Sequence, residues 1–384
     1  HPVCCLLPMR KLLAFTVTLA LVAAVTAYLV WTQERPVAHY LSDLRITLAV
    51  NEGVPADRGN LLGIQPELFP ADYQSLERLH LKLAAYLQNA RDQGLINEKT
   101  IVVLPEHIGT WLMLTGEKNE VYQALHLKEA MNWLSISNPV QFVRAWISAT
   151  GADRMDDAYL RMKAPAMARD YQVLFGGLAK EFGVTLVAGS IALPNPSISQ
   201  RQLQIGHGAL YNASVVFAAD GLPIGDPQRQ LYPIYDEREF IQPGDENVVS
   251  VVDTPAGRLG VLVGSDSWYP DNYRKLNENG AHLIAVPALV TGRDTWDRPW
   301  RGFKSVSTPP EVSLKPEELS EGEAWRRLTL ISQQPVSQAS AGMSVFLRGQ
   351  FWDLGTAGHS FLSSNGQISA DGDARGARML NIWL

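Results

Sequence analysis

Gly260-Val-Leu-Val-Gly-Ser-Asp-Ser-Trp-Tyr-Pro-Asp271 is the stretch of this 384-residue sequence that decides its fold. Its apolar start is followed at once by Gly264, Ser265 and Asp266, and a second apolar run, Leu283 to Val286, comes shortly after. Short continuous apolar runs bounded by turn residues are typical of buried strands. The polar residues between the two runs are therefore expected at the end of a strand.

Outside this stretch, predicted strands and helices alternate along the chain. Apolar or branched runs predict strands at residues 44–50, 100–104, 184–188, 210–218 and 248–252. Apolar residues at helical spacing predict helices over residues 73–94 and 165–182. Strands and helices interleave early while strands cluster in the middle, which favours a layered α/β sandwich.

Two polar stretches that contain tryptophan, residues 115–165 and 291–326, interrupt this pattern. Long insertions in a compact domain are either functional lids or solvated surface loops. The sequence leaves both alternatives open.

The amino-terminal region contains an uncharged run of twenty residues, Leu12 to Trp31. As a helix it is long enough to cross a hydrocarbon core of about 30 Å. Arg10 and Lys11 precede it, so the positive-inside rule predicts a cytoplasmic amino terminus and an extracytoplasmic remainder. A signal peptide cleaved after Val25-Thr-Ala27 is the alternative, and it is disfavoured because the apolar run continues to Trp31.

These features predict three regions. Residues 1–8 are expected to be an upstream extension that precedes the start of translation at Met9, and residues 9–32 to be a signal anchor. Residues 44–384 are expected to form one globular domain. The location that follows is the cell inner membrane, crossed once, with the domain facing the periplasm.

Composition excludes several other classes. The formal charge of −6 and the absence of long Lys or Arg runs argue against a nucleic-acid partner. The two cysteines, Cys4 and Cys5, precede the apolar run, so no disulfide framework is expected in the domain. The eight histidines show no paired or HExxH spacing. No metal and no cofactor are therefore predicted.

Four segments, in order, resemble the nitrilase superfamily of carbon-nitrogen hydrolases. They are Leu104-Pro-Glu106, the pair Leu210–Phe217 and Gln228–Glu237, the stretch from Gly260, and Ala357–Gly366. The second segment is most similar to the apolipoprotein N-acyltransferase branch. The resemblance covers most of residues 44–384 and implies a nitrilase-like α-β-β-α sandwich and a homodimer.

The resemblance also implies the site. Glu106 corresponds to the general base, and Glu237 to a further glutamate that lines the family's active sites. Arg229 stands where the family carries an oxyanion-stabilising lysine, and Gly264 where it carries the catalytic cysteine. A buried carboxylate needs a partner, so Glu106 is expected within reach of Arg229.

Ser265 is the substitute nucleophile to consider. If residues 260–265 are a strand, successive side chains point to opposite faces, and a shift by one residue turns this hydroxyl away from the pocket. A triad of Ser265, His359 and Asp266 would be a second route, but the sequence has no nucleophile-elbow pattern. His359 is expected to be a hydrogen-bonded structural histidine.

Three functions compete. The first is a membrane-anchored extracytoplasmic protein that has lost its cysteine nucleophile and binds a small amide-like ligand or a partner. The second is a hydrolase of carbon-nitrogen (amide) bonds that uses Glu106 with water, or Ser265. The third, acyl transfer to lipoproteins, is disfavoured because that branch has a multi-helix membrane domain whereas this chain has one apolar span. The missing cysteine disfavours both enzymes, and Glu106 with Glu237 keeps them open.

Overall fold

The structure is a computed structural model of the chain, and it describes residues 6–35, 39–330, 336–370, 372 and 375–384. Cys4 and Cys5, with most of the expected upstream extension, lie outside the described residues.

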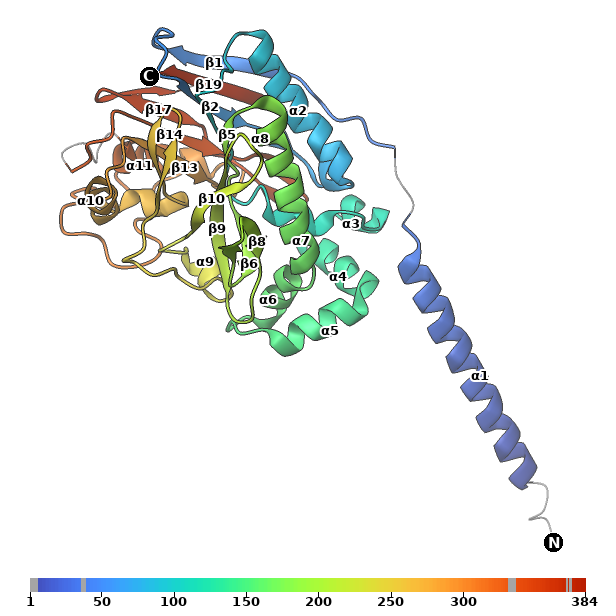
Figure 1. The fold of residues 1–384 in the computed structure, drawn as a ribbon. Helices are drawn as coiled ribbons and strands as arrows, with labels where there is room; N and C mark the ends of the chain where they lie inside the picture. The colour runs from blue at the N-terminus through green and yellow to red at the C-terminus, as the bar shows by residue number, and fades with distance from the viewer. Residues whose placement is uncertain (1–5, 36–38, 331–335, 371, 373–374) are drawn as a thin grey trace.

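Two β-sheets stacked face to face form the centre of the domain (Figure 1). The first sheet contains β1 (Ile46–Glu52), β2 (Asn60–Gln65), β4 (Thr100–Val103), β5 (Thr185–Val187), β6 (Ile191–Pro194), β9 (Leu210–Phe217), β10 (Pro223–Arg229) and β19 (Ala377–Trp383). Its order is β1-β19-β2-β4-β5-β9-β10, with β6 also paired to β9.

The second sheet contains β11 (Val251–Thr254), β12 (Gly257–Val261), β13 (Leu283–Ala288), β14 (Ala341–Phe346), β17 (Phe361–Ser364) and β18 (Gln367–Ala370), in this order. Smaller ladders join β3 (Glu67–Leu68), β15 (Arg348–Phe351) and β16 (Leu354–Gly355), and also β7 (Ser197–Ser199) and β8 (Gln202–Gln204). The strands β2, β4 and β5 are parallel, as are β12, β13 and β14.

Helices cover both outer faces. The helices α2 (Leu76–Asp92), α7 (Ala164–Tyr171) and α8 (Gly177–Phe182) pack on the first sheet, and α10 (Pro270–Glu278) and α11 (Glu321–Leu328) on the second. One apolar layer lies between each sheet and its helices, and a third lies between the two sheets. The predicted nitrilase-like α-β-β-α sandwich is therefore confirmed, because each sheet buries one face against the other sheet and one against helices.

The predicted helix over residues 73–94 shows why these elements form. It is observed as α2, which begins after Ser75, whose side chain accepts a hydrogen bond from the backbone N–H of Arg78. The buried residues Leu79, Leu83 and Leu87 repeat at four-residue spacing and face the sheet.

The stretch 115–165 is helical, which the sequence did not predict. It folds into α3 (Asn119–Gln123), α4 (Leu127–Ser137), α5 (Pro139–Ser148) and α6 (Arg154–Arg161). The stretch 291–326 is mostly irregular, but it buries Trp296 and Trp300 against the second sheet. Neither insert is a freely solvated loop.

The helix α1 (Leu6–Gln33) leaves the domain and projects away from it (Figure 1). Its part from Met9 to Gln33 is long and apolar enough to cross a membrane, and an apolar window of 18 residues within it has no part buried inside the protein. Signal sequences share this length and composition.

Candidate functional site

The carboxyl group of Glu106 is the centre of the candidate site. Glu106 follows β4 at its carboxyl end and is only 5% exposed. Nδ2 of Asn212, on β9, donates a hydrogen bond to its Oε1 at 3.0 Å, and Nε2 of Gln230, just after β10, donates to the same oxygen at 3.4 Å. Strand β9 and the segment just after β10 thus hold this carboxyl group in place.

Burial changes the acidity of this group. It raises the pKa of Glu106 to about 8, with the nearby His107 acting against the shift and Glu237 and Asp266 adding to it. At neutral pH the protonated form is therefore favoured. A protonated carboxyl group can donate one hydrogen bond as well as accept others.

The sequence did not single out His107, which lies next to Glu106. Its Nε2 is 3.2 Å from Oε1 of Glu237, and its Nδ1 is 2.8 Å from Oγ1 of Thr110. Burial lowers the pKa of His107, but Glu237 raises it by charge and by hydrogen bonding, and the net shift is upward. The φ of His107 is +61°, a strained conformation for a non-glycine residue that is often found at functional sites.

Glu106, His107 and Glu237 each offer a ligand atom, and these atoms lie within 4.8 Å of one another, so the group could hold a metal ion. This cluster needs the tertiary structure to form, because Glu237 comes from α9 (Tyr235–Arg238), over a hundred residues away. No spacing in the sequence indicates it.

Gly264 faces Glu106. A Cβ built on Gly264 would lie 2.8 Å from Oε2 of Glu106, and the φ of Gly264 is +57°. This left-handed conformation is easy for glycine and costly for other residues. Position 264 thus combines a backbone that favours glycine with an orientation toward the buried acid.

The prediction that Glu106 lies within reach of Arg229 is wrong. Nη2 of Arg229 donates to Oδ1 of Asn195 at 2.8 Å, and the guanidinium lies 3.9 Å from the ring centre of Tyr211. Within the described residues, no ion pair joins Arg229 to Glu106. Successive side chains of a strand point to opposite faces, so Arg229 at the end of β10 points away and Gln230 points in.

The side chain of Ser265 also points in a direction other than the expected one. It lines the same cavity as Glu106, whereas strand geometry predicted that it turns away. The reason is local: β12 ends at Val261, and residues Gly264–Trp268 form a 3₁₀ helix. The two-residue alternation of a strand does not apply there.

The triad of Ser265, His359 and Asp266 does not form. The carboxyl group of Asp266 accepts the backbone N–H groups of Leu231 and Tyr232 at 2.7 and 2.8 Å. His359 instead has Nδ1 3.0 Å from the carbonyl oxygen of Gly372 and stacks on Trp296. Asp266 and His359 are therefore structural residues, as was expected for His359. The carboxyl group of Asp266 holds the segment after β10 against the 3₁₀ helix.

The groups around Glu106 open into a cavity of about 350 Å³. It is lined by Glu106, Leu127, Asp156, Gln230, Ile234, Asp236, Glu237, Phe240, Ser265, Trp268, Leu289, Val290, Thr291, Thr295, Lys304, Glu321, Trp325 and Leu354. A more apolar cavity of about 200 Å³ shares part of this wall and reaches Met131, Tyr159 and Leu160. The site lies at the carboxyl ends of β4 and β12, where ligands of α/β sheets usually bind.

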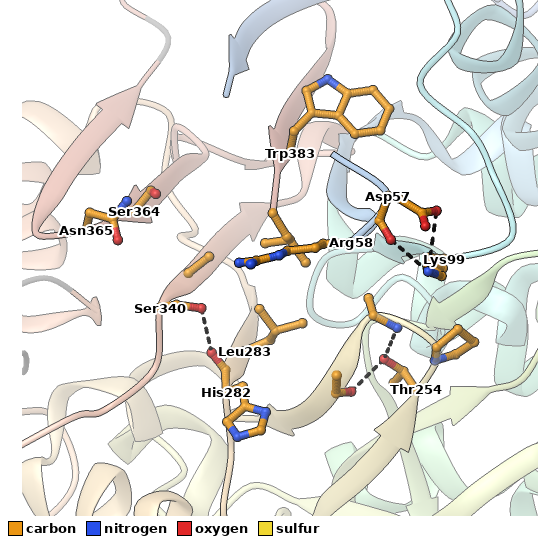
Figure 2. A pocket seen from close by; sticks show the side chains of 15 residues that line it. Asp57, Arg58, Lys99, Thr254, His282, Leu283, Ser340, Ser364, Asn365 and Trp383 are labelled. Carbon is orange, nitrogen blue, oxygen red and sulfur yellow. Dashed lines mark hydrogen bonds and ion pairs between the residues drawn. The ribbon is translucent and has the colours of Figure 1, made fainter. Parts of the chain in front are cut away.

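A larger cavity of about 640 Å³ lies at the opposite ends of these strands (Figure 2). It contains Arg58, Lys99 and His282, and Nζ of Lys99 donates to the carbonyl oxygen of Asp57 at 2.7 Å. None of the site residues predicted from the sequence lines it. The smaller cavity at Glu106 is therefore the candidate functional site.

The sandwich and a buried glutamate at a strand end define the nitrilase-like class of proteins. A sequence model described as carbon-nitrogen hydrolase matches residues 64–302, which is more than half of the chain. The chain therefore belongs to the carbon-nitrogen hydrolase family.

Its relatives include amidases and nitrilases. The deaminated glutathione amidase of Yersinia enterocolitica is 28% identical over 172 residues, 42% of this chain and 53% of that protein. An N-carbamoylputrescine amidase of Solanum tuberosum is 24% identical over 169 residues, 41% and 52% of the two chains. A nitrilase of Pyrococcus abyssi is 32% identical over 111 residues, 29% and 37%. The matches thus span about half of these relatives' length or less.

Solved structures support the fold. A cysteine-to-serine mutant of the Nesterenkonia AN1 amidase has a TM-score of 0.51 and 13% sequence identity, with 86% of this chain and 93% of that chain covered. This likeness concerns the fold alone.

Proposed function

We propose that this chain is a membrane-anchored nitrilase-fold protein that binds a small amide-like ligand and has lost the thiol chemistry of its family. The observation that carries the proposal is Gly264, whose missing side chain would point at Glu106. In a glutamate-to-glutamine mutant of the Nesterenkonia amidase, the acetamide moiety of fluoroacetamide adds covalently to the active-site cysteine. A glycine at the corresponding place cannot form such a bond.

The cavity still suits an amide. An amide presents one carbonyl acceptor and N–H donors. A protonated Glu106 can donate to the carbonyl oxygen, while the carboxylate of Glu237 can accept an N–H. The apolar cavity beside them, with Met131 and Leu160 in its wall, suits a short apolar substituent on the ligand.

The alternative is an amide hydrolase, and one observation favours it. Ser265 and Glu106 line the same cavity. In the deprotonated form, Glu106 could take a proton from the Ser265 hydroxyl or from a water molecule in this cavity. A base works best when its pKa is close to the operating pH, and that of Glu106 is about 8. Water activation would lack the covalent intermediate that divides the reaction into two easier steps.

One experiment separates the two functions. The full chain in detergent is incubated with short primary amides and with N-carbamoylputrescine, and both its melting temperature and the ammonia released are followed. Binding alone predicts a rise in melting temperature that depends on amide concentration, without ammonia. Glu237→Gln should reduce this rise, because one acceptor for the amide N–H is weakened.

Ammonia release by the wild-type chain that disappears in Ser265→Ala would replace the binding function with the serine hydrolase. Release that survives in Ser265→Ala but disappears in Glu106→Gln would indicate water activation. No thermal shift and no ammonia with any amide would contradict both functions.

For the location, we propose a single uncleaved anchor in the inner membrane with the domain in the periplasm. Arg10 and Lys11 precede the span, and the positive-inside rule places that side in the cytoplasm. The helix α1 continues unbroken past Ala27 to Gln33. This continuity supports an anchor over a cleaved signal peptide.

A further inference from the structure

The helix α5 exposes an apolar face. Val140, Val143 and Ile147 are 53%, 55% and 73% exposed, and their spacing of three and four residues places them on one side of the helix. On the opposite side Ala145 is buried in the domain core and Phe142 packs against it. The exposed apolar face is thus additional to the face that the domain needs for packing.

The preceding helix extends this surface. Ile136, near the end of α4, is 45% exposed, and α5 begins three residues later at Pro139. Trp146, next to Ile147, is 40% exposed. Contiguous exposed apolar surface of this kind marks a site of interaction with a protein or a membrane.

The end of α1 lies against the same insert. The hydroxyl of Tyr28 donates a hydrogen bond to the carbonyl oxygen of Ile136 at 2.6 Å. The rings of Trp31 and Trp133 lie with their centres 6.3 Å apart. The carboxyl end of α1 therefore contacts α4, the helix that precedes α5 in the insert (Figure 1).

Polar contacts hold the two parts together. Nζ of Lys118 donates to the carbonyl oxygen of Glu34 at 2.6 Å and lies 4.1 Å from the ring centre of Trp31. Nη2 of Arg35 donates to the carbonyl oxygen of Ser137 at 3.2 Å. These contacts join the end of α1 to the residue before α3 and to the last residue of α4.

From this arrangement we infer that Ile136, Val140, Val143, Trp146 and Ile147 form a membrane-contact face, which enters the interface of the lipid bilayer beside α1. The inference rests on the proposed membrane anchoring of α1.

Three features favour lipid over a protein partner. A bilayer that contains α1 must reach the level of Tyr28 and Trp31, which are residues typical of membrane interfaces. The face adjoins that level and carries Trp146. Arg144 lies on the same side of α5, where its long side chain can reach lipid phosphates while its stem stays among apolar groups. Interfacial helices of this kind sit roughly 5–10 Å into the headgroup and acyl boundary.

The test uses the full chain in single-copy lipid nanodiscs with Cys4 and Cys5 replaced by serine. Spin labels are placed by Val143→Cys or Ile147→Cys, and their collision rates with oxygen and with a water-soluble nickel chelate are measured. A label at Gln141, on the flank of α5, and one at Gln88, on the exposed side of α2, are the controls. A label at Leu19, in the middle of α1, reports the anchor.

We expect the oxygen-to-chelate ratio at positions 143 and 147 to approach that of the Leu19 label and to exceed that of the Gln88 label several-fold, with Gln141 in between. Ratios at 143 and 147 equal to that at Gln88, while Leu19 is lipid-exposed, would overturn the membrane-contact face and leave the anchor intact. A water-exposed Leu19 label would show instead that the anchor itself is wrong. If the labels at positions 143 and 147 are shielded from the nickel chelate in concentrated micelles but not in single-copy nanodiscs, a second copy of the chain covers the face. That result would overturn the inference.

Discussion

Gly264 faces the carboxyl group of Glu106 with a φ of +57°, and the side chain that donates to Glu106 from the segment after β10 is that of Gln230, not Arg229. The proposed loss of catalysis rests on two observations: Gly264, at the expected thiol position, has no side chain, and the amide of Gln230 stands beside the acid. What stays is a buried acid whose pKa is raised to about 8 by burial.

The first prediction concerns the pH dependence of stability. Burial raises the pKa of Glu106 from 4.5 to about 8 in the folded state. Between these two values the native state keeps a proton that the unfolded state has lost, so this group's contribution to the free energy of unfolding falls as pH rises through that window. The fall is at most about 1.4 kcal/mol per pH unit.

Urea unfolding of the wild-type chain and of Glu106→Gln at several pH values from 5 to 8 measures this effect. The stability of the wild-type chain relative to the variant should decline with rising pH. Asp266, whose pKa burial also raises to about 8, is present in both proteins, so most of its own pH dependence is shared by them. The charge of Glu106 also raises the pKa of His107, and the loss of this interaction in Glu106→Gln adds to the decline. A difference that stays flat across the window would contradict the raised pKa of Glu106.

The second prediction concerns restored chemistry. Gly264→Cys, in a chain with Cys4 and Cys5 replaced by serine, should lose roughly 1–2 kcal/mol of stability because of its left-handed φ. It should show a reactive thiol but little amide turnover. Adding Gln230→Lys restores a cation beside Glu106 and should raise turnover by about a hundredfold, the scale of one oxyanion-stabilising group.

Arg229→Lys is the control in the same Gly264→Cys background, because the side chain at position 229 points toward Asn195. It should not raise turnover. Equal activation by the lysine at 229 would show that the orientation of these two residues is misassigned.

At the scale of elements, the helical insert α3–α6 connects the anchor to the site. Leu127 of α4 and Asp156 of α6 line the cavity at Glu106, whereas the end of α4 contacts α1. Glu117, just before α3, links these parts, since its Oε1 is 2.7 Å from Nζ of Lys163 and its Oε2 is 4.0 Å from Nη2 of Arg35.

The third prediction tests this link. Glu117→Gln leaves the largely buried Lys163 without its carboxylate and should lower the free energy of unfolding by on the order of 3 kcal/mol. Lys163→Met in the same chain should recover much of the loss, because it removes the uncompensated charge. Glu181→Gln, which removes an exposed pair with His80, should cost less than about 1 kcal/mol.

Thermal or urea unfolding of the full chain in detergent measures all three variants. If Glu117→Gln cost no more than Glu181→Gln, the buried pair would contribute nothing to the stability of the insert.

At the scale of the whole molecule, the chain consists of one apolar helix and one compact sandwich. An apolar window of 18 residues in α1 has no part buried in the domain, and the proposed membrane would cover this apolar surface. The sandwich buries its own apolar layers, and the proposed membrane-contact face is an exposed apolar surface outside them.

The fourth prediction concerns orientation. A phosphatase reporter that is active only outside the cytoplasm should be active when fused after Leu384, because Arg10 and Lys11 hold the amino terminus inside. Replacing both basic residues by glutamate should reduce this activity. A fusion that is active only with a cytoplasmic reporter would contradict the proposed orientation.

The fifth prediction is the homodimer that the family resemblance implies. Light scattering of the chain in detergent, corrected for bound detergent, should give twice the mass of 42.3 kDa. The double variant Val143→Ser with Ile147→Ser should remain dimeric, because the membrane-contact face is assigned to lipid. A monomeric wild-type chain would contradict the dimer.

The sequence by itself determined the family and the layered fold, because short apolar runs, an amphipathic helix and the order of four motifs depend on local pattern and spacing. It also singled out Glu106, Gly264 and the apolar amino-terminal helix. Only the tertiary structure decided which side chains meet. Whether Arg229 or Gln230 faces Glu106 depends on which side chains point to which face of the sheet at the end of β10. The direction of the Ser265 side chain depends on a 3₁₀ helix that follows β12 in place of a longer strand. The cluster with His107 and Glu237, and the contact between α1 and the helical insert, join residues distant in sequence, and such contacts are set by packing, which no local pattern records.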